Sequence, residues 1–254
     1  MDNVGGSHIH GQLARPAQKG KLPALLILQW AGVYPLQREW VTDRAAQGWL
    51  ALNIEPHDMP IDAGPSGAPG NYASLGNDDR EKSYFLRMYL SVCQAVQYLA
   101  GRPDWDGRTL VVTGVSMGGQ QTLVAAGLCP QVTAALALVP AGADMLGPEA
   151  GRRGGYPQWY DDVGGKDPAK VHEASRYFDT ANFAARIRCP VLVSFGLLDE
   201  TSPPSGVVAA FNQIHAPKQM LILTRSPHQD VGGSQTPFWR LRDDAWLPAL
   251  KAGW

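Results

Sequence analysis

The sequence predicts an α/β fold in which helices cover both faces of a mostly parallel, doubly wound sheet. Strand-like and helix-like segments alternate along almost the whole 254-residue chain, which is typical of strands joined by helical crossovers. Apolar runs such as residues 25–28 and 110–112 have strand length, as expected for strands that are buried on both faces. The chain is long enough for one large α/β domain, so we expect a single domain over residues 1–254.

The predicted elements follow one another in a regular order. Strands are expected at residues 8–15, 24–30, 50–54, 109–113, 134–139, 189–196 and 219–224, where β-branched and other apolar residues gather. Helices are expected at residues 36–47, 79–100, 120–128, 205–215 and 236–251, and the second carries Tyr84, Met88, Val92, Ala95 and Leu99 at helical spacing. Residues 60–77 are rich in Gly, Pro, Ser and Asn and are expected to form a long loop.

The segment LVVTGVSMGG at residues 110–119 carries the strongest functional signal. An apolar run ends in Gly114-x-Ser116-x-Gly118 and passes directly into a helix-forming run. This pattern is typical of the nucleophile elbow of the α/β-hydrolase fold, a tight turn that lifts a serine hydroxyl above the sheet edge. Such a turn needs small neighbours, which the two glycines provide. The sequence therefore predicts an α/β-hydrolase with Ser116 as nucleophile, rather than an idle serine in a glycine-rich turn.

A serine hydroxyl needs a base to take its proton and an acid to orient that base. Asp199 follows the predicted strand at 189–196, and His228 follows the strand at 219–224. Nucleophile, acid and histidine in that chain order are characteristic of this fold. We therefore predict Ser116, Asp199 and His228 as the catalytic triad.

Other acids and histidines are weaker candidates. Asp144 follows the strand at 134–139 and stays open as the acid of a variant arrangement. His57 precedes the nucleophile, which is the wrong order for this fold. Two further carboxylates are expected to point elsewhere and two further histidines to be surface or packing residues: Glu200, Asp230, His172 and His215.

The negatively charged intermediate of acyl transfer needs two backbone N–H donors. One is expected from Met117, the residue after the nucleophile. The second is expected from the loop between Trp30 and Tyr34, with Ala31 and Gly32 as the candidates, since the glycine lets the backbone turn there.

Residues 142–175 break the alternation and are expected to form a short cap insertion between two strands. They contain Gly–Pro clusters and the aromatic residues Tyr156, Trp159 and Tyr160. Aromatic rings in such an insertion either stack on sugar rings or pin the insertion to the core. These three residues are therefore candidate substrate contacts, together with Trp30 and Tyr34 of the predicted oxyanion loop.

Composition excludes several other classes of function. The net charge is −1 with both signs mixed along the chain, so a nucleic-acid partner is not expected. No apolar run reaches the roughly 18–20 residues of a membrane span, and the N-terminus lacks the pattern of a signal peptide. The three cysteines are widely spaced and are expected to be free thiols in the cytoplasm. Neither a metal site nor a cofactor is predicted, because no metal-ligand spacing is present and the triad needs neither.

Further motifs support one family. They are DREKSY at 79–84, DGR at 106–108, VP at 139–140, YFD at 177–179, NFA at 182–184, CPVLVS at 189–194 and GLLD at 196–199. On these motifs the chain resembles the acetyl xylan esterase / cephalosporin-C deacetylase family of carbohydrate esterases. By this resemblance Ser116, Asp199 and His228 match the family's nucleophile, acid and base.

The chain also departs from the family pattern. Met117 stands where the family usually has Gln, a change that a backbone donor survives. Residues 55–58 read EPHD where the family tends to show an Arg-Gly-rich turn. The family's ring-like hexamer keeps a homo-oligomer open for this chain.

These observations predict a serine esterase that removes small acyl groups, chiefly acetyl, from sugar hydroxyls of xylan-type oligosaccharides. The alternative is a dienelactone-hydrolase-like or broad-specificity carboxylesterase, or a small peptidase-like hydrolase, since the same triad serves all of them. A non-catalytic binding protein on the same scaffold is disfavoured, because the triad is complete and in order.

Overall fold

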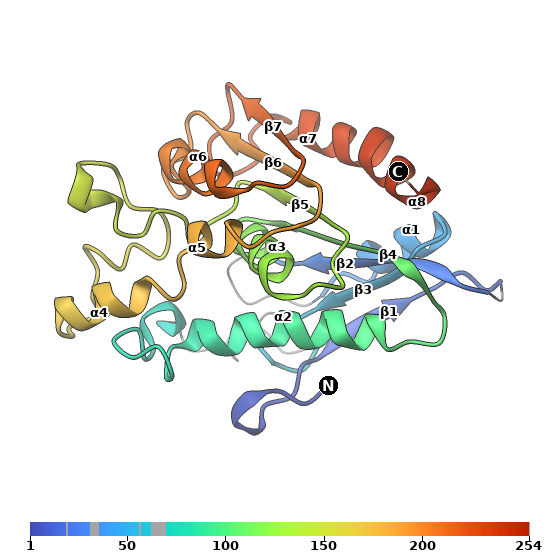
Figure 1. Ribbon diagram of the computed structural model, residues 1–254, viewed down its shortest axis with the longest axis horizontal. Helices are drawn as coiled ribbons and strands as arrows, with labels where there is room; N and C mark the ends of the chain where they lie inside the picture. Colours follow the sequence, from blue (N-terminus) through green and yellow to red (C-terminus); the bar gives the residue numbers. More distant parts are fainter. Residues whose placement is uncertain (19, 31–35, 56, 62–69, 254) are drawn as a thin grey trace.

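A seven-stranded sheet forms the centre of the described protein (Figure 1). The computed structural model describes residues 1–18, 20–30, 36–55, 57–61 and 70–253. The strands lie in the order β1-β3-β2-β4-β5-β6-β7. Their bounds are β1 (Gly11–Ala14), β2 (Leu22–Leu28), β3 (Leu50–Ile54), β4 (Trp105–Val115), β5 (Ala134–Leu138), β6 (Val191–Gly196) and β7 (Lys218–Leu223). β1 is antiparallel to β3 and the other pairs are parallel, as the apolar pattern predicts.

Helices cover both faces of the sheet. They are α1 (Glu39–Ala46), α2 (Tyr84–Ala100), α3 (Met117–Leu128), α4 (Pro168–Ser175), α5 (Thr180–Ala184), α6 (Pro204–Gln213), α7 (Thr236–Arg240) and α8 (Leu247–Ala252). A π-helical segment, η4 (Leu241–Trp246), joins the last two, so the predicted closing helix is continuous but wider in its middle turn. Short 3-10 helices are η1 (Val4–Gly6), η2 (Tyr72–Ser74) and η3 (Gly147–Ala150).

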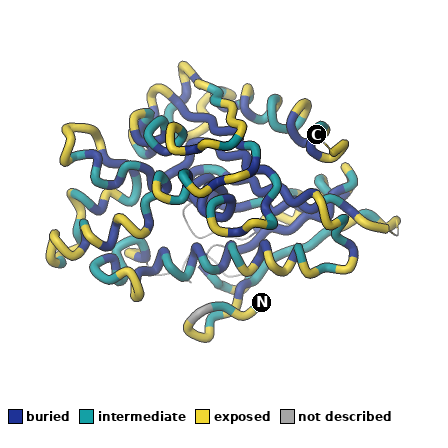
Figure 2. The backbone as a smooth tube through the Cα atoms, viewed as in Figure 1, coloured by how far each residue is buried: buried dark blue, intermediate teal, exposed yellow. Residues whose placement is uncertain are grey.

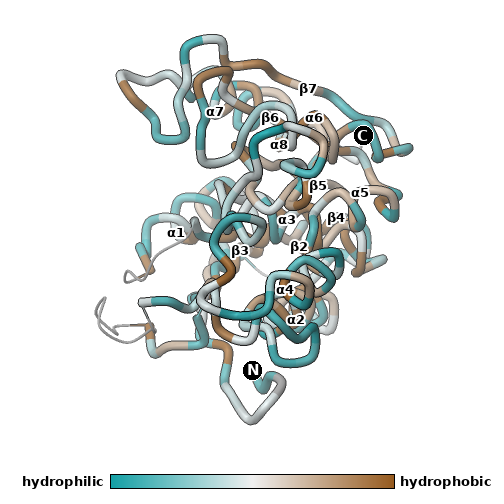
Figure 3. The backbone as a smooth tube through the Cα atoms, turned by 90° about the vertical axis from the view of Figure 1, so that its left-hand side faces the viewer, coloured by the Kyte–Doolittle hydropathy of each residue, from teal (hydrophilic) through white to brown (hydrophobic). Residues whose placement is uncertain are grey.

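The core lies in two layers, one on each face of the sheet. Neighbouring residues of β2 point to opposite faces. Leu26 therefore belongs to the core cluster that includes residues of α2, α3 and α6, while Leu25 belongs to the one that includes residues of α1, α7 and α8. The view from the side shows the strands between α1 and α2 (Figure 3), and the buried segments run through the centre of the fold (Figure 2). This is the doubly wound arrangement that the sequence predicts.

Two helix starts differ from the prediction. α2 begins at Tyr84 rather than residue 79, because the Ser83 hydroxyl caps it by accepting from the Phe85 N–H at 3.3 Å. α3 begins at Met117, directly after Ser116, where residue 120 was expected. The missed start follows from the glycines at 118 and 119, which hide the helical pattern from sequence reasoning.

The segment between β5 and β6 carries η3, α4 and α5 and lies with η2 and the start of α2 at one end of the molecule (Figure 1). It has its own apolar cluster, in which Trp159, Val171 and Phe178 pack on Phe85 and Tyr89 of α2. Among the described residues, no helix combines the length and apolar content needed to cross a membrane.

Candidate active site

Ser116 lies at the sharp turn between β4 and α3. Its φ of 56° and ψ of −117° are strained for a residue with a side chain. The turn closes tightly: a Cβ at Gly114 would lie 2.3 Å from the carbonyl oxygen of Gly118, and a Cβ at Gly118 would lie 2.4 Å from that of Leu28. Both glycines are therefore required by close backbone approach, which is the reason the sequence analysis gave for them.

The structure brings Ser116, His228 and Asp199 into one hydrogen-bonded chain. The Ser116 Oγ lies 2.8 Å from His228 Nε2, and His228 Nδ1 lies 2.8 Å from Asp199 Oδ2. The residues come from the ends of β4, β6 and β7, and parallel strands end at the same edge of a sheet. With the proton on Nδ1, the imidazole donates to the carboxylate and accepts from the serine hydroxyl.

The Asp199 carboxylate is fixed by its own loop. Its Oδ1 accepts from the backbone N–H groups of Thr201 and Ser202 at 2.9 and 2.7 Å. The side chain is fully buried, and that of His228 is 12% exposed. The acid is therefore shielded while the histidine reaches the surface of the site.

Gln235 holds the histidine loop from the other side, and sequence reasoning missed it. The buried Gln235 donates from Nε2 to the carbonyl oxygen of His228 at 2.9 Å. Its backbone N–H donates to Asp230 Oδ1 at 3.0 Å. An amide a few residues beyond a histidine has no recognisable signal in a sequence, because its role depends on how the loop folds back.

The expected oxyanion donors are described only in part. Met117 is the first residue of α3, and the N–H of a helix's first residue has no acceptor within the helix. Its side chain is buried against Tyr72, Tyr84 and Met88, which fixes the start of the helix. Ala31, Gly32 and Tyr34 lie outside the described residues.

A cavity of about 960 Å³ opens at the serine and histidine. Trp30 and Tyr156, two of the predicted substrate contacts, line it with Ser116 and His228. The Tyr156 hydroxyl lies 2.8 Å from that of Tyr72. Burial raises the pKa of Tyr156 above its usual value, so this hydroxyl keeps its proton. The site thus combines a serine hydroxyl, an imidazole oriented by a carboxylate and a wide space beside them.

The family model of acetyl xylan esterase (AXE1) matches residues 1–146 and 152–240 of the chain. The chain belongs to the acetyl xylan esterase (AXE1) family. An acetyl esterase of this kind, Axe7A of Xylanibacter ruminicola, is 35% identical over 230 residues, which cover 87% of this chain and 52% of the relative. The chain therefore spans about half the length of that relative.

Solved structures show the same fold. An acetyl xylan esterase from Paenibacillus sp. R4 aligns over 99% of this chain and 81% of its own, with a TM-score of 0.81 and 26% identity. Acetyl xylan esterase 1 from Thermoanaerobacterium sp. JW/SL YS485 aligns over 94% and 80%, with a TM-score of 0.77 and 24% identity. A putative dienelactone hydrolase from Klebsiella pneumoniae shares the fold at 18% identity, with a TM-score of 0.65 over 100% of this chain and 97% of its own. The chain has the α/β-hydrolase fold.

Two of the aromatic residues predicted to contact substrate lie away from the cavity at Ser116. Trp159 is 1% exposed, packs edge-on against Phe85 and donates from Nε1 to the carbonyl oxygen of Ala73 at 2.8 Å. Tyr160 stacks on His172 with ring centroids 4.5 Å apart. Neither lines the cavity at Ser116, so the prediction was wrong for both. They hold the segment between β5 and β6 together, since a buried indole needs both packing and a partner for its N–H.

The alternative acid is occupied elsewhere. Asp144 forms a two-pronged ion pair with Arg152, at 2.7 and 3.0 Å. The exposed Glu200 lies 3.5 Å from Arg153. His215 is exposed beyond the end of α6. None of these side chains contacts the histidine at the serine.

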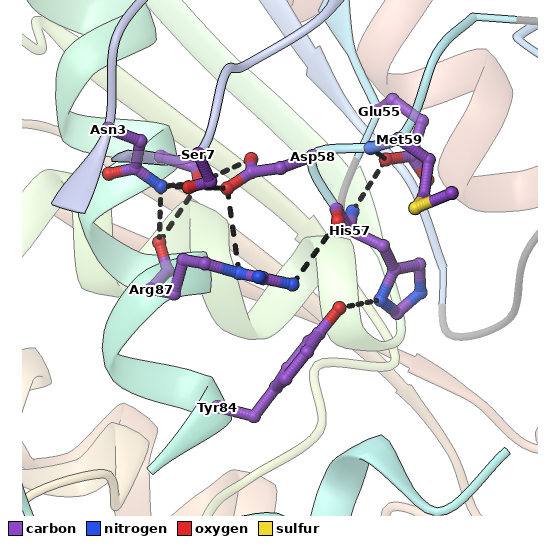
Figure 4. Close-up of polar contacts among 9 residues, drawn as sticks. Asn3, Ser7, Glu55, His57, Asp58, Met59, Tyr84 and Arg87 are labelled. Atoms are coloured by element: carbon purple, nitrogen blue, oxygen red, sulfur yellow. Dashed lines mark hydrogen bonds and ion pairs between the residues drawn. The ribbon is translucent and has the colours of Figure 1, made fainter. Parts of the chain in front are cut away.

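The turn after β3, where this chain departs from the family pattern, holds a separate polar cluster (Figure 4). His57 is 1% exposed and its Nδ1 lies 3.2 Å from the Tyr84 hydroxyl. Asp58 forms an ion pair with Arg87 at 3.5 Å and accepts from the Asn3 amide at 2.9 Å. His57 is thus a buried packing residue behind Met117, consistent with its exclusion as the catalytic base.

Glu55 anchors the same turn. Its Oε2 accepts from the backbone N–H groups of His57 and Met59 at 2.8 and 2.7 Å. Its Oε1 is buried and has no hydrogen-bond partner among the described residues. Burial raises the pKa of the Glu55 carboxyl above its usual value and outweighs the two hydrogen bonds.

Two other expectations concern cysteine and metal. The three cysteines are free, and the Sγ atoms of Cys93 and Cys129 lie 3.1 Å apart between α2 and the end of α3. Within the described part of the chain, no group of three or more His, Cys, Asp or Glu side chains is arranged to hold a metal ion.

Proposed function

We propose that this family member is a serine esterase that removes acetyl groups from the hydroxyls of xylan-type sugars. The observation that carries the proposal is the hydrogen-bonded chain from Ser116 through His228 to Asp199, open to the cavity at the serine. Membership of the acetyl xylan esterase family supports the acyl group and the class of substrate.

The geometry gives each residue a role. His228 Nε2 takes the hydroxyl proton of Ser116 as Oγ attacks the acetyl carbonyl carbon, and the C=O oxygen becomes an oxyanion. The backbone N–H of Met117, which has no acceptor within α3, is the proposed donor to this charge. Asp199 keeps the proton of the imidazole on Nδ1 and stabilises the imidazolium.

The proton then passes from His228 to the leaving group, which completes the first half of the reaction. The C–O bond to the sugar breaks and His228 gives its proton to the departing sugar oxygen, which leaves an acetyl ester on Ser116. A water molecule then loses a proton to Nε2 and attacks this ester, and acetate leaves while the serine regains its proton. Nucleophile, base and orienting acid are all side chains of the protein, so the proposed reaction uses no cofactor.

The cavity supports a bulky alcohol part. A two-carbon acyl group fills a small part of about 960 Å³, while pockets of this size hold ligands as large as drugs or short oligosaccharides. We also propose one α/β-hydrolase domain over residues 1–254, with residues 142–175 as its cap. Trp30 and Tyr156 are the proposed substrate contacts at the serine.

Acetate release separates this function from that of a general carboxylesterase. The wild-type protein should release acetate from acetylated xylo-oligosaccharides with a kcat/KM at least equal to that for nitrophenyl acetate. Ser116→Ala should lose both activities by about a thousandfold or more. Turnover of the aryl ester without acetate release from the sugars would contradict the sugar-deacetylase proposal and leave a broad carboxylesterase.

A further inference from the structure

The cavity at Ser116 continues well beyond the catalytic side chains. Its floor is formed by Ile27 and Thr113, which are paired across β2 and β4. α1 forms one wall, and α7 with η4 forms the other. The Arg44–Asp243 ion pair, with a distance of 3.0 Å, joins these walls at the far end. We call this space the groove.

Indole rings line the groove on both walls. Trp239 of α7 lines it and carries the guanidinium of Arg242 4.5 Å from its ring centroid. Trp30 and Trp40 meet edge-on with centroids 5.4 Å apart, and Trp30 is 41% exposed. Trp30 is exposed, while Trp40 and Trp239 are half-buried. Indole rings that line a groove offer flat apolar faces, which match the C–H face of a sugar ring.

The charges of the groove select against an anionic ligand. Among its described lining residues there are four carboxylates and two guanidinium groups, a formal balance of −2: Glu39, Asp43, Asp230 and Asp243 against Arg44 and Arg242. Both arginines share the carboxylate of Asp243, and the other three carboxylates give the lining its negative balance. α1 therefore contributes acidic as well as aromatic side chains to the groove, namely Glu39, Asp43 and Trp40.

We propose that the groove binds a neutral sugar chain, with Trp239 stacked on a ring next to the acetylated residue. The acidic side chains of α1, Glu39 and Asp43, make the groove select unsubstituted chains over chains that bear a uronic acid. Both statements rest on the proposed function, and they name the parts of the substrate that lie beyond the ester.

The stacking role is tested by Trp239→Ala with three neutral substrates: acetylated xylotriose, acetylated xylose and nitrophenyl acetate. KM should rise about tenfold more for the trisaccharide than for the two small esters. Trp239→Phe should recover most of the loss, because it keeps an aromatic face. Equal losses on all three substrates would overturn the assignment, since they indicate a structural role.

Tyr177→Ala is the matched control. Tyr177 is 44% exposed and also carries a guanidinium over its ring, that of Arg80 at 4.6 Å, but it lies outside the groove. Removing this ring should leave all three kcat/KM values within about twofold. A loss on the trisaccharide like that of Trp239→Ala would show that stacking in the groove is not the cause, and would overturn the proposal.

The charge selection is tested with acetylated xylo-oligosaccharides that do or do not carry a uronic acid. The wild type should prefer the neutral chain, and added salt should narrow the preference because it screens the exposed carboxylates. The double variant Glu39→Gln, Asp43→Asn should raise the ratio of kcat/KM for the acidic chain to kcat/KM for the neutral chain several-fold. Equal rates on both chains for wild type and variant would overturn the selection.

The two proposals fail in different ways. If the wild type cleaves nitrophenyl acetate but no acetylated sugar, the proposed function fails and the groove assignment falls with it. If the wild type deacetylates sugars while Trp239→Ala and the double variant behave like the wild type, the proposed function stands and the groove assignment alone is wrong.

Discussion

Three groups hold the imidazole of His228 in one orientation. Asp199 receives the Nδ1 proton, the Ser116 hydroxyl lies at Nε2, and Gln235 holds the backbone carbonyl. The two oxygens of Asp199 have separate duties, because Oδ1 is occupied by the N–H groups of Thr201 and Ser202. The carboxylate therefore cannot rotate without losing two backbone hydrogen bonds.

Because the two oxygens of Asp199 bind different partners, the effect of Asp199→Asn can be predicted. The amide oxygen will keep the two N–H groups at the Oδ1 position, which places its NH₂ against His228 Nδ1. The imidazole must then accept at Nδ1 and carry its proton on Nε2, where it can no longer take a proton from Ser116. We expect kcat on nitrophenyl acetate to fall by about 10³–10⁴-fold, with little change in stability.

Asp144→Asn is the control for this experiment, because Asp144 also follows a strand of the sheet but is bound to Arg152. It should retain kcat within about threefold. If it instead loses as much as Asp199→Asn, the acid of the triad has been assigned to the wrong strand end.

The stability of the folded protein depends on pH through Glu55, in the turn that follows β3. The Glu55 carboxyl is buried, and its raised pKa means that the folded protein keeps a proton which the unfolded chain loses near the ordinary value of 4.5. This contribution to stability is fully present below about pH 4.5 and is lost as the pH rises through the raised pKa. Burial of the charged form then weakens the fold at neutral pH.

Glu55→Gln should remove this pH dependence. Its amide oxygen can replace Oε2 as the acceptor of both backbone N–H groups, and it carries no charge to desolvate. The free energy of unfolding of the variant minus that of the wild type should become more positive as the pH rises above about 4.5 and should then level off. Urea unfolding at a series of pH values measures this difference.

Glu149→Gln is the control, because Glu149 is exposed. It measures how far the loss of one carboxylate charge changes the pH dependence of stability without any effect of burial. A Glu55→Gln difference that is flat with pH, or that moves in the wild type's favour as the pH rises, would contradict a buried carboxyl with a raised pKa.

Across the molecule, the residues that the sequence could assign are those set by backbone topology. A parallel sheet brings the ends of β4, β6 and β7 to one edge (Figure 1). The order of Ser116, Asp199 and His228 along the chain was therefore enough to predict that they meet. The strands β2 to β6 inside the sheet could be found because burial on both faces leaves continuous apolar runs, whereas the edge strands β1 and β7 are only partly buried.

Side chains whose surroundings come from distant segments could not be assigned in this way. Tyr156 and Trp159 lie in the same short aromatic stretch, yet one lines the cavity and the other is buried against α2. Which ring faces the cavity depends on how the segment folds back on η2 and α2. The groove between α1 and α7 is hidden for the same reason, because its walls are far apart in sequence.

Covalent labelling tests most directly whether Ser116 carries the acyl group. A fluorophosphonate should abolish turnover of nitrophenyl acetate and add one adduct per chain, which peptide mapping by mass spectrometry should place on Ser116. Ser116→Ala should melt within a few degrees of the wild type, take up no label and retain at most about a thousandth of the turnover. An inactivating adduct on another residue, or near-native turnover by the folded alanine variant, would contradict the assignment of this serine as the nucleophile.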